Sequence, residues 1–301
     1  MTRIKRSLFV GTIAFISNHT ENGKKVEACF APDEGMNLLS LKIKGKEVLD
    51  LSTKEMFSLR SAGLGALIGP HFHHRSSPYI PIKRDLSFFK HIKKLPETQK
   101  ELFSHGIARY VPWKYQADGT QIIATLKGSD LFHDCPIKEL EGFDFEMHFE
   151  ARAIHDGLLI DYRIQSQTPS VIGFHYYYKA SKNAFLTSLV KPSYRSNKGI
   201  NQIPQEIYKM DQKKLYLKIE NEIDWGFFPI LDENTTGNLI ILDNEDYHLH
   251  IEYASSNDND SSFQVYHPKE SSFVCIEPLS SLNPREPTSL FSHIQLKISL
   301  Y

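Results

Sequence analysis

A carboxylate follows an apolar run in the stretch SSFVCIEPLSS, residues 271–281. The run predicts a buried strand, and Pro278, which has no N–H to donate, predicts where that strand ends. Burying the Glu277 carboxylate costs several kcal/mol unless it is paired or hydrogen-bonded. Two interpretations stay open. Glu277 is either a structural carboxylate paired with Arg75 or a histidine, or a base with a raised pKa in a cleft.

A histidine lies among aromatic residues in the stretch SVIGFHYYYKA. Three tyrosines, Tyr176, Tyr177 and Tyr178, follow His175, so we expect an aromatic wall around the imidazole. Burial disfavours the charged imidazole and a nearby carboxylate favours it, so we expect titration near physiological pH. Such a group suits acid–base catalysis, and aromatic faces stack on sugar rings. The structural alternative is a core histidine bonded to a backbone carbonyl.

The densest histidine cluster is GPHFHHR, which contains His71, His73, His74 and Arg75. A His-x-His pair on a strand places two imidazoles on one face, which suits a metal ion. A cupin-like metal enzyme would also need a glutamate a few residues later, and the following stretch RSSPYIPIKRD contains none. The pattern therefore favours a Gly-Pro loop with solvated histidines over a metal site.

Another histidine, His105, precedes a glycine in the stretch FSHGIARYVPWKY. The backbone at Gly106 can adopt a positive φ and aim the imidazole in an unusual direction. From these residues alone, His105 is interpreted as a loop histidine beside a strand.

Composition excludes some classes of partner. The chain has 301 residues, and its 35 basic and 36 acidic side chains give a net charge of −1. Non-specific binding of nucleic acid or of a membrane surface needs a positive excess, so we expect neither partner. Three cysteines, Cys29, Cys135 and Cys275, form no disulfide framework and indicate free thiols in a reducing compartment.

No apolar run is long enough to cross a bilayer. The first residues, MTRIKRSLFVGTIAFISN, have a basic start and a short apolar core, but no small-residue cleavage site follows. These features predict a cytoplasmic protein.

Short segments of alternating apolar and polar residues must position these side chains. The stretch NLLSLKIKGKEVLDL predicts a tight hairpin at residues 44–46, and EMHFEARAIHDGLLIDYRI predicts two long strands joined at 155–157. Many strands at near-regular spacing predict an all-β fold, a large antiparallel β-sandwich with a few short helices. We find no linker, so one domain over residues 1–301 is expected. The lysine-rich interval 82–103 predicts one or two short helices with Asp85 as an N-cap.

In this order, the segments resemble the aldose 1-epimerase (galactose mutarotase-like) family. The matching pieces are EGMNLLSLKIKGKEVL, GPHFHHR, HGIARYVPWKY, the strand pair followed by IGFHYYYKA, and SFQVYHPKESSFVCIEPLSSLNP. The third is similar to the family's His-Gly-(Phe/Leu)-x-Arg-x-x-x-Trp segment, and IGFHYYYKA is similar to its Gly-x-His-Pro-Tyr-Phe. The resemblance runs from about residue 8 to residue 301 and implies a galactose mutarotase-like supersandwich.

The resemblance also implies an activity, the interconversion of the α and β anomers of a free aldose. It makes Glu277 the general base that takes the proton from the C1 hydroxyl. It makes His175 the general acid that protonates the ring oxygen and opens the hemiacetal. The chemistry needs one proton removed and one delivered, so no metal and no redox cofactor is expected.

Four more residues become substrate-binding candidates by resemblance: His105 near the ring oxygen, Arg75 and Asp224 at sugar hydroxyls, and Tyr177. Three features depart from the family. Tyr176 replaces the usual proline. The arginine loop is rich in histidine, so either His74 or Arg75 could face the sugar. The lysine-rich interval 82–103 is not a clean family hairpin, and it could supply positive charge for a hexose 6-phosphate.

The expected partner is a small sugar, and the protein is either a monomer or a homodimer. A non-catalytic carbohydrate-binding protein on the same fold is the alternative function. Absence of Glu277 or His175 would favour that alternative, and both residues are present.

Overall fold

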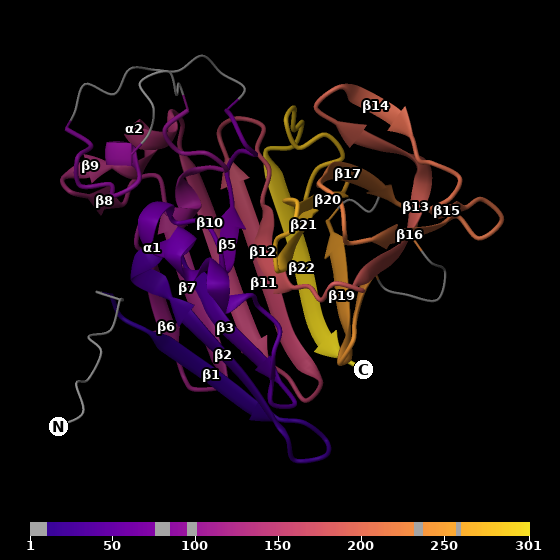
Figure 1. Cartoon of the computed structure of the whole chain (residues 1–301). Helices are drawn as coiled ribbons and strands as arrows, with labels where there is room; N and C mark the ends of the chain where they lie inside the picture. Colours follow the sequence, from indigo (N-terminus) through magenta and orange to yellow (C-terminus); the bar gives the residue numbers. More distant parts are fainter. Residues whose placement is uncertain (1–10, 76–84, 95–100, 232–236, 257–259) are drawn as a thin grey trace.

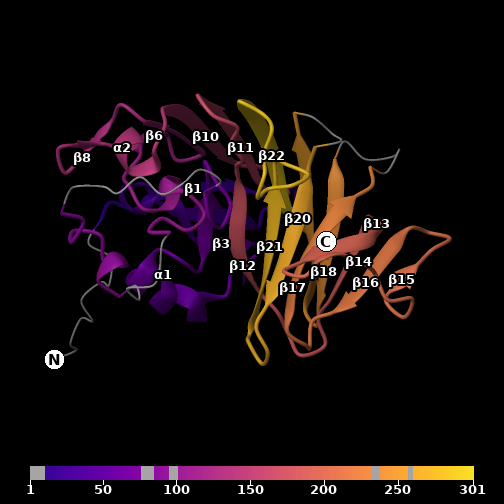
Figure 2. The ribbon, with the colours of Figure 1, turned by 90° about the horizontal axis from the view of Figure 1, so that it is seen from above.

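The computed structural model describes residues 11–75, 85–94, 101–231, 237–256 and 260–301. Two antiparallel sheets form its two layers, and they face each other across a common apolar core (Figures 1 and 2). The predicted β-sandwich with a few short helices is confirmed.

The first sheet carries the candidate site. Its strands, in spatial order, are β1 (Ala14–His19), β2 (Lys25–Ala31), β3 (Asn37–Ile43), β5 (Gly65–Ile68), β12 (Gly173–Lys179), β21 (Phe273–Leu279), β20 (Ser262–His267) and β17 (Ile223–Pro229). The short strand β4 (Lys46–Glu47) also pairs with β3.

The second sheet closes the sandwich from behind. Its order is β6 (Lys114–Ala117), β7 (Gln121–Lys127), β10 (Phe145–Ala153), β11 (Gly157–Ser166), β22 (Phe291–Leu300), β19 (Tyr247–Ser255), β18 (Asn238–Asn244), β13 (Phe185–Ser196), β16 (Lys214–Lys218) and β15 (Tyr208–Lys209). The long strand β13 joins the two layers, because its first half pairs with β16 and β18 and its second half with β17 and β14 (Gly199–Gln202).

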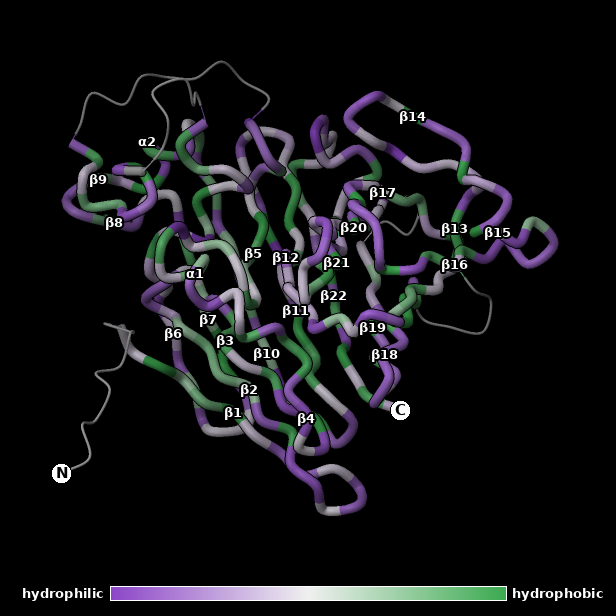
Figure 3. The backbone as a smooth tube through the Cα atoms, viewed as in Figure 1, coloured by the Kyte–Doolittle hydropathy of each residue, from purple (hydrophilic) through white to green (hydrophobic). Residues whose placement is uncertain are grey.

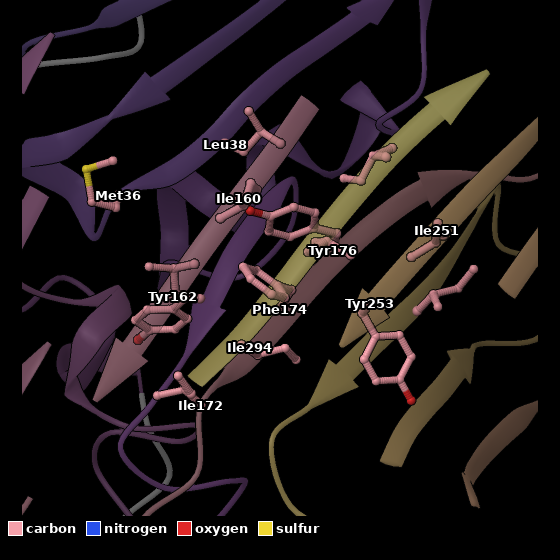
Figure 4. Close-up of a cluster of buried hydrophobic side chains, with 14 of the residues drawn as sticks. Met36, Leu38, Ile160, Tyr162, Ile172, Phe174, Tyr176, Ile251, Tyr253 and Ile294 are labelled. Atoms are coloured by element: carbon pink, nitrogen blue, oxygen red, sulfur yellow. The ribbon is translucent and has the colours of Figure 1, made fainter. Parts of the chain in front are cut away.

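Side chains alternate between the core and the outer face of the first sheet, as strand geometry requires. On β12, Phe174 and Tyr176 point into the core, where Figure 4 shows them near Tyr162 of β11. The Phe174 and Tyr162 ring centroids are 5.9 Å apart. Figure 3 shows hydrophobic residues along the strands of both sheets and hydrophilic residues in the outlying β14–β15 region. Because side chains alternate along β12, His175 and Tyr177 face outward, away from the core.

Short helices lie in the connections between the strands. They are the 3-10 helices η1 (Pro32–Glu34), η2 (Leu51–Thr53), η3 (Ile92–Lys94) and η4 (Ile107–Arg109), and the α-helices α1 (Lys54–Arg60) and α2 (Ile137–Glu141). A further pair of two-residue strands, β8 (Leu131–Phe132) and β9 (Cys135–Pro136), lies just before α2.

Both predicted hairpins are confirmed. The turn between β3 and β4 has positive φ at Lys44 and Gly45, the conformation that suits a tight hairpin. The turn at 155–157 joins β10 to β11, and the two strands pair from Ala153 and Leu158 onward.

The predicted end of the strand at Pro278 is wrong. Strand β21 continues through Pro278 to Leu279, and Pro278 pairs with Phe263 on β20. On the β12 side, the ladder pairs Gly173 with Leu279 and next Tyr176 with Ile276. The ladder lapses between those pairs because Pro278 has no N–H to donate.

The lysine-rich interval is described only in part. Residues 82–84 and 95–100 lie outside the described residues. Within the described part, the predicted N-cap Asp85 accepts the Ser87 N–H at 2.8 Å and caps a turn, whereas the helix there is η3. Among the described residues, no helix combines the length and the apolar character that crossing a membrane requires.

Candidate active site

The strand register brings the two central candidates together. Tyr177 on β12 pairs with Cys275 on β21, so the positions of His175 and Glu277 also lie opposite each other. On its other side, Glu277 pairs with Gln264 of β20. Cys275 and Glu277 share the outer face of β21, while Val274 and Ile276 are in the core. A carboxylate can therefore end an apolar run, because it belongs to the other face of the strand.

This face forms the floor of a cavity of about 900 Å³. The cavity is walled by helix α1, by the loop before β6 and by the ends of β17 and β20. Its lining includes Glu55, Arg60, Phe72, His73, His91, Glu101, His105, Arg109, Tyr110, His175, Tyr177, Asp224, Gln264, Tyr266, Glu277 and Arg285.

Glu277 and His175 form a close pair at the cavity floor. The distance from His175 Nε2 to Glu277 Oε1 is 3.3 Å. Glu277 is 2% exposed and His175 is 7% exposed. The second carboxylate oxygen, Oε2, and the second imidazole nitrogen, Nδ1, have no hydrogen-bond partner among the described residues. Both groups therefore keep one polar atom for a ligand or for water.

Burial opposes charge on both members of this pair. It raises the pKa of Glu277 well above its usual value, an effect that the charge of Arg109 reduces and that of Asp224 reinforces. Burial lowers the pKa of His175 well below its usual value, and Arg109 lowers it further. The predicted titration of His175 near physiological pH is thus wrong, because desolvation dominates.

Arg109 is a buried cation beside this pair. It is 3% exposed, and its Nε donates to the Leu67 carbonyl of β5 at 3.0 Å. Its Nη2 has no partner among the described residues. Arg109 lies in the segment HGIAR but is not among the predicted site residues, because no local sequence signal predicts that its charge is buried beside Glu277 and His175.

His105 reaches the cavity through the predicted unusual backbone. Gly106 has φ 85° and His105 itself has φ 67°. A Cβ on Gly106 would lie 2.0 Å from the Gly69 carbonyl oxygen, so only glycine fits there. The His105 ring meets the His175 ring edge to face, with centroids 5.1 Å apart. Its buried Nδ1 lacks a partner among the described residues.

One tyrosine of the predicted aromatic wall lies at the site. Tyr177 stacks on His175 with ring centroids 5.0 Å apart and an interplanar angle of 17°. Tyr176 and Tyr178 are fully buried in the core, so the expectation that they wall the imidazole is wrong. Consecutive residues of a strand point to opposite faces, which only Tyr177 and His175 share.

Arg75 does not line the cavity, which corrects its predicted place at the sugar. Its Nε and Nη2 donate to the two carboxylate oxygens of Glu101, at 2.9 and 3.0 Å. Its Nη1 donates to the Leu140 and Glu141 carbonyls at the end of α2. The carboxylate of Glu141 in turn contacts His71 Nδ1 at 2.6 Å. Arg75 thus links its own loop to Glu101 and to the end of α2.

This network holds Glu101 as a carboxylate. Burial raises its pKa, but hydrogen bonds from Arg75 and the charge of His71 outweigh that effect and lower the pKa to about 2. We call Arg75, Glu101, His71 and Glu141 the buried clamp. Nδ1 of His71 contacts Glu141 in the clamp, and His71 belongs to no metal-ligand group among the described residues.

Of the loop histidines, His73 lines the cavity and the exposed His74 does not. Among the described residues, the one group of three potential metal-ligand side chains is His175, Cys275 and Glu277, whose ligand atoms lie within 4.8 Å of one another. This group is the Glu277–His175 pair plus the buried Cys275 thiol, and the described part of the histidine-rich loop forms no such group.

Asp224 is exposed at the cavity and accepts a hydrogen bond from Gln264 Nε2 at 2.6 Å. The cations of the cavity lining are Arg60, Arg109 and Arg285. No lysine of the described residues lines the cavity, so the lysines in the described part of the lysine-rich interval supply no positive charge there.

The fold is that of galactose mutarotase-like proteins. A galactose mutarotase-like protein from Lactobacillus casei matches with TM-score 0.68 and 14% identity, over 96% of this chain and 100% of that one. The Slr1438 protein from Synechocystis matches with TM-score 0.66 and 15% identity, over 99% of both chains. An aldose epimerase homologue from C. elegans matches with TM-score 0.63 and 12% identity, over 96% and 99%.

Comparison with protein-family models gave no match. Comparison with curated proteins also gave none.

Proposed function

We propose that the protein is an aldose 1-epimerase that interconverts the anomers of an aldose by acid–base ring opening. The observation that carries this proposal is the 3.3 Å contact between Glu277 and His175 at the cavity floor. A cyclic hemiacetal bears its hydroxyl oxygen and its ring oxygen on the same carbon. A base for one and an acid for the other must therefore stand side by side, as these two groups do.

The proposed reaction moves one proton in each direction. Glu277, as the carboxylate, takes the proton of the C1 hydroxyl while His175, as the imidazolium, gives its proton to the ring oxygen. The bond between C1 and the ring oxygen breaks, which leaves the open-chain aldehyde, a carboxylic acid and a neutral imidazole. Rotation about C1–C2 and the reverse proton transfers close the ring on the other face.

Burial supports the ring-opening step energetically. It disfavours charge on both Glu277 and His175, and both groups lose their charge when the ring opens. Arg109 favours the ionised form of Glu277, which is the form that acts as the base. We assign His105 to the ring oxygen and Tyr177 and Asp224 to sugar hydroxyls, since all three line the cavity.

We infer that a phosphorylated hexose, if it is the substrate, places its phosphate near Arg60 or Arg285. Both are exposed cations at the cavity. Equal rates of mutarotation for glucose and glucose 6-phosphate would count against a phosphorylated substrate.

Optical rotation tests the proposal. Freshly dissolved α-glucose, α-galactose and α-glucose 6-phosphate are followed with wild type, with Glu277→Gln and with the control Glu286→Gln, which changes an exposed carboxylate outside the cavity lining. We expect acceleration of at least one sugar by wild type and by the control, and loss of that acceleration in Glu277→Gln. A wild type that binds a sugar but is no faster than buffer would favour the alternative, a non-catalytic carbohydrate-binding protein.

A further inference from the structure

His73, and not the predicted sugar ligand Arg75, lines the cavity. Its ring lines the cavity, whereas the Arg75 guanidinium is turned into the buried clamp and its side chain is 8% exposed. The two residues are two positions apart in the same loop, and of the two His73 is the one that lines the cavity.

The backbone at His73 is held in an unusual conformation. Its φ is 61°, in the left-handed region that residues other than glycine rarely adopt. The neighbouring His105 has the same feature, and its N–H donates to the His73 carbonyl at 3.3 Å. Such conformations cluster at functional sites, where the surrounding structure enforces them.

The ring of His73 continues a row of imidazoles that leads to the acid–base pair. Its centroid is 5.7 Å from that of His105, which is 5.1 Å from that of His175. The exposed ring of His74 packs behind it at 4.1 Å. His73 and His175 thus line one cavity with His105 between them.

Charged groups from several elements face this imidazole. Partial desolvation, His74 and Arg285 lower the pKa of His73, Asp224 of β17 raises it, and His71 lowers it. Its ring is neutral at neutral pH and offers one donor and one acceptor, which suits an uncharged hydroxyl.

We propose that His73 is a specificity-determining residue that hydrogen-bonds a sugar hydroxyl on the far side of the ring from C1. This inference rests on the proposed function in one respect, that a sugar occupies the cavity. The side chain acts in binding and takes no part in the proton transfers.

Three variants separate the side chain from the backbone. His73→Gly removes the imidazole and accepts a φ of 61° without strain, so its unfolding midpoint is not expected to fall. His73→Asn keeps a donor and an acceptor and tolerates the left-handed region. His74→Ala changes the exposed neighbour outside the cavity lining and is the matched control.

We expect KM to rise about tenfold in His73→Gly, the effect of losing one hydrogen bond, with kcat within about twofold of wild type. His73→Asn is expected to recover part of the loss, and His74→Ala to leave KM unchanged. A monodeoxy sugar that lacks the contacted hydroxyl should lose affinity for wild type but not for His73→Gly. Equal losses for both proteins at every deoxy position would overturn the proposal.

Binding of the same sugars, measured by saturation-transfer NMR, separates this inference from the proposed function. If wild type binds the sugars but has no mutarotase activity, and His73→Gly binds them more weakly, the catalytic proposal is refuted and the role of His73 is supported. Active wild type with unchanged KM in His73→Gly would refute the role of His73 alone. If wild type neither binds nor converts any of the sugars, both the proposed function and the role of His73 are overturned.

Discussion

Replacing Arg75 by methionine distinguishes a structural arginine from a sugar ligand. The change keeps a long side chain but removes the cation that binds Glu101 through two nitrogens and two carbonyls of α2. The side chains of Arg75 and Glu101 are 8% and 5% exposed, so water does not replace the lost contacts. Removing one partner of a buried ion pair costs about 3–5 kcal/mol. We expect the free energy of unfolding of Arg75→Met to fall by this amount.

The loss should also depend on pH. The folded pKa of Glu101 is about 2, below its ordinary value of 4.5. Its contribution to stability is therefore present above pH 4.5 and is lost as pH falls toward 2. The destabilisation of Arg75→Met should shrink over the same interval.

Urea unfolding at several pH values and sugar KM are measured for Arg75→Met, Glu101→Gln and the double variant. The double variant should lose less than the sum of the single variants, because it leaves neither Glu101 nor Arg75 as a lone buried charge. An unchanged unfolding midpoint of Arg75→Met together with a large rise in its KM would refute the structural role and indicate that Arg75 binds the sugar.

Three further predictions concern the pair and its support. After subtraction of the buffer rate, kcat/KM should fall in acid, where both Glu277 and His175 hold protons, and again in alkali, where neither does. Glu277→Gln should melt at a higher temperature than wild type at pH 9, and the difference should be smaller at pH 5. The raised pKa of Glu277 in the folded protein favours folding below the pKa of the unfolded chain, and this effect is lost as pH rises through the folded pKa. An equal difference in melting temperature at both pH values would contradict this prediction. Gly106→Ala should lower the melting temperature by several degrees, because its Cβ would meet the Gly69 carbonyl; unchanged melting would show that the backbone can move aside.

Local sequence signals predicted much of the sheet and part of the site. The turns at 44–46 and 155–157 follow from glycines between alternating segments, and both are hairpins. The resemblance to aldose 1-epimerases, and not a local signal, predicts that Glu277, His175 and His105 lie together, and the structure brings them to one cavity.

Long-range contacts decided what local patterns could not predict. Arg75 turns away from the cavity because it donates hydrogen bonds to Glu101 and to the end of α2. These partners are 26 and about 65 residues away along the chain. His73 faces the cavity because of a left-handed φ that nothing in its neighbours' identities requires. Pro278 stays within β21 because that strand continues to pair with β20 there, where Pro278 lies opposite Phe263.

Exchange NMR at equilibrium tests the central claim most directly. With a sugar labelled with ¹³C at C1, exchange cross-peaks between the α and β signals report interconversion without net reaction. Wild type is predicted to raise the exchange rate in proportion to its concentration, and Glu277→Gln and His175→Asn are each predicted to return it to the buffer value. Equal acceleration by wild type and both variants would contradict the assignment of acid–base catalysis to this pair.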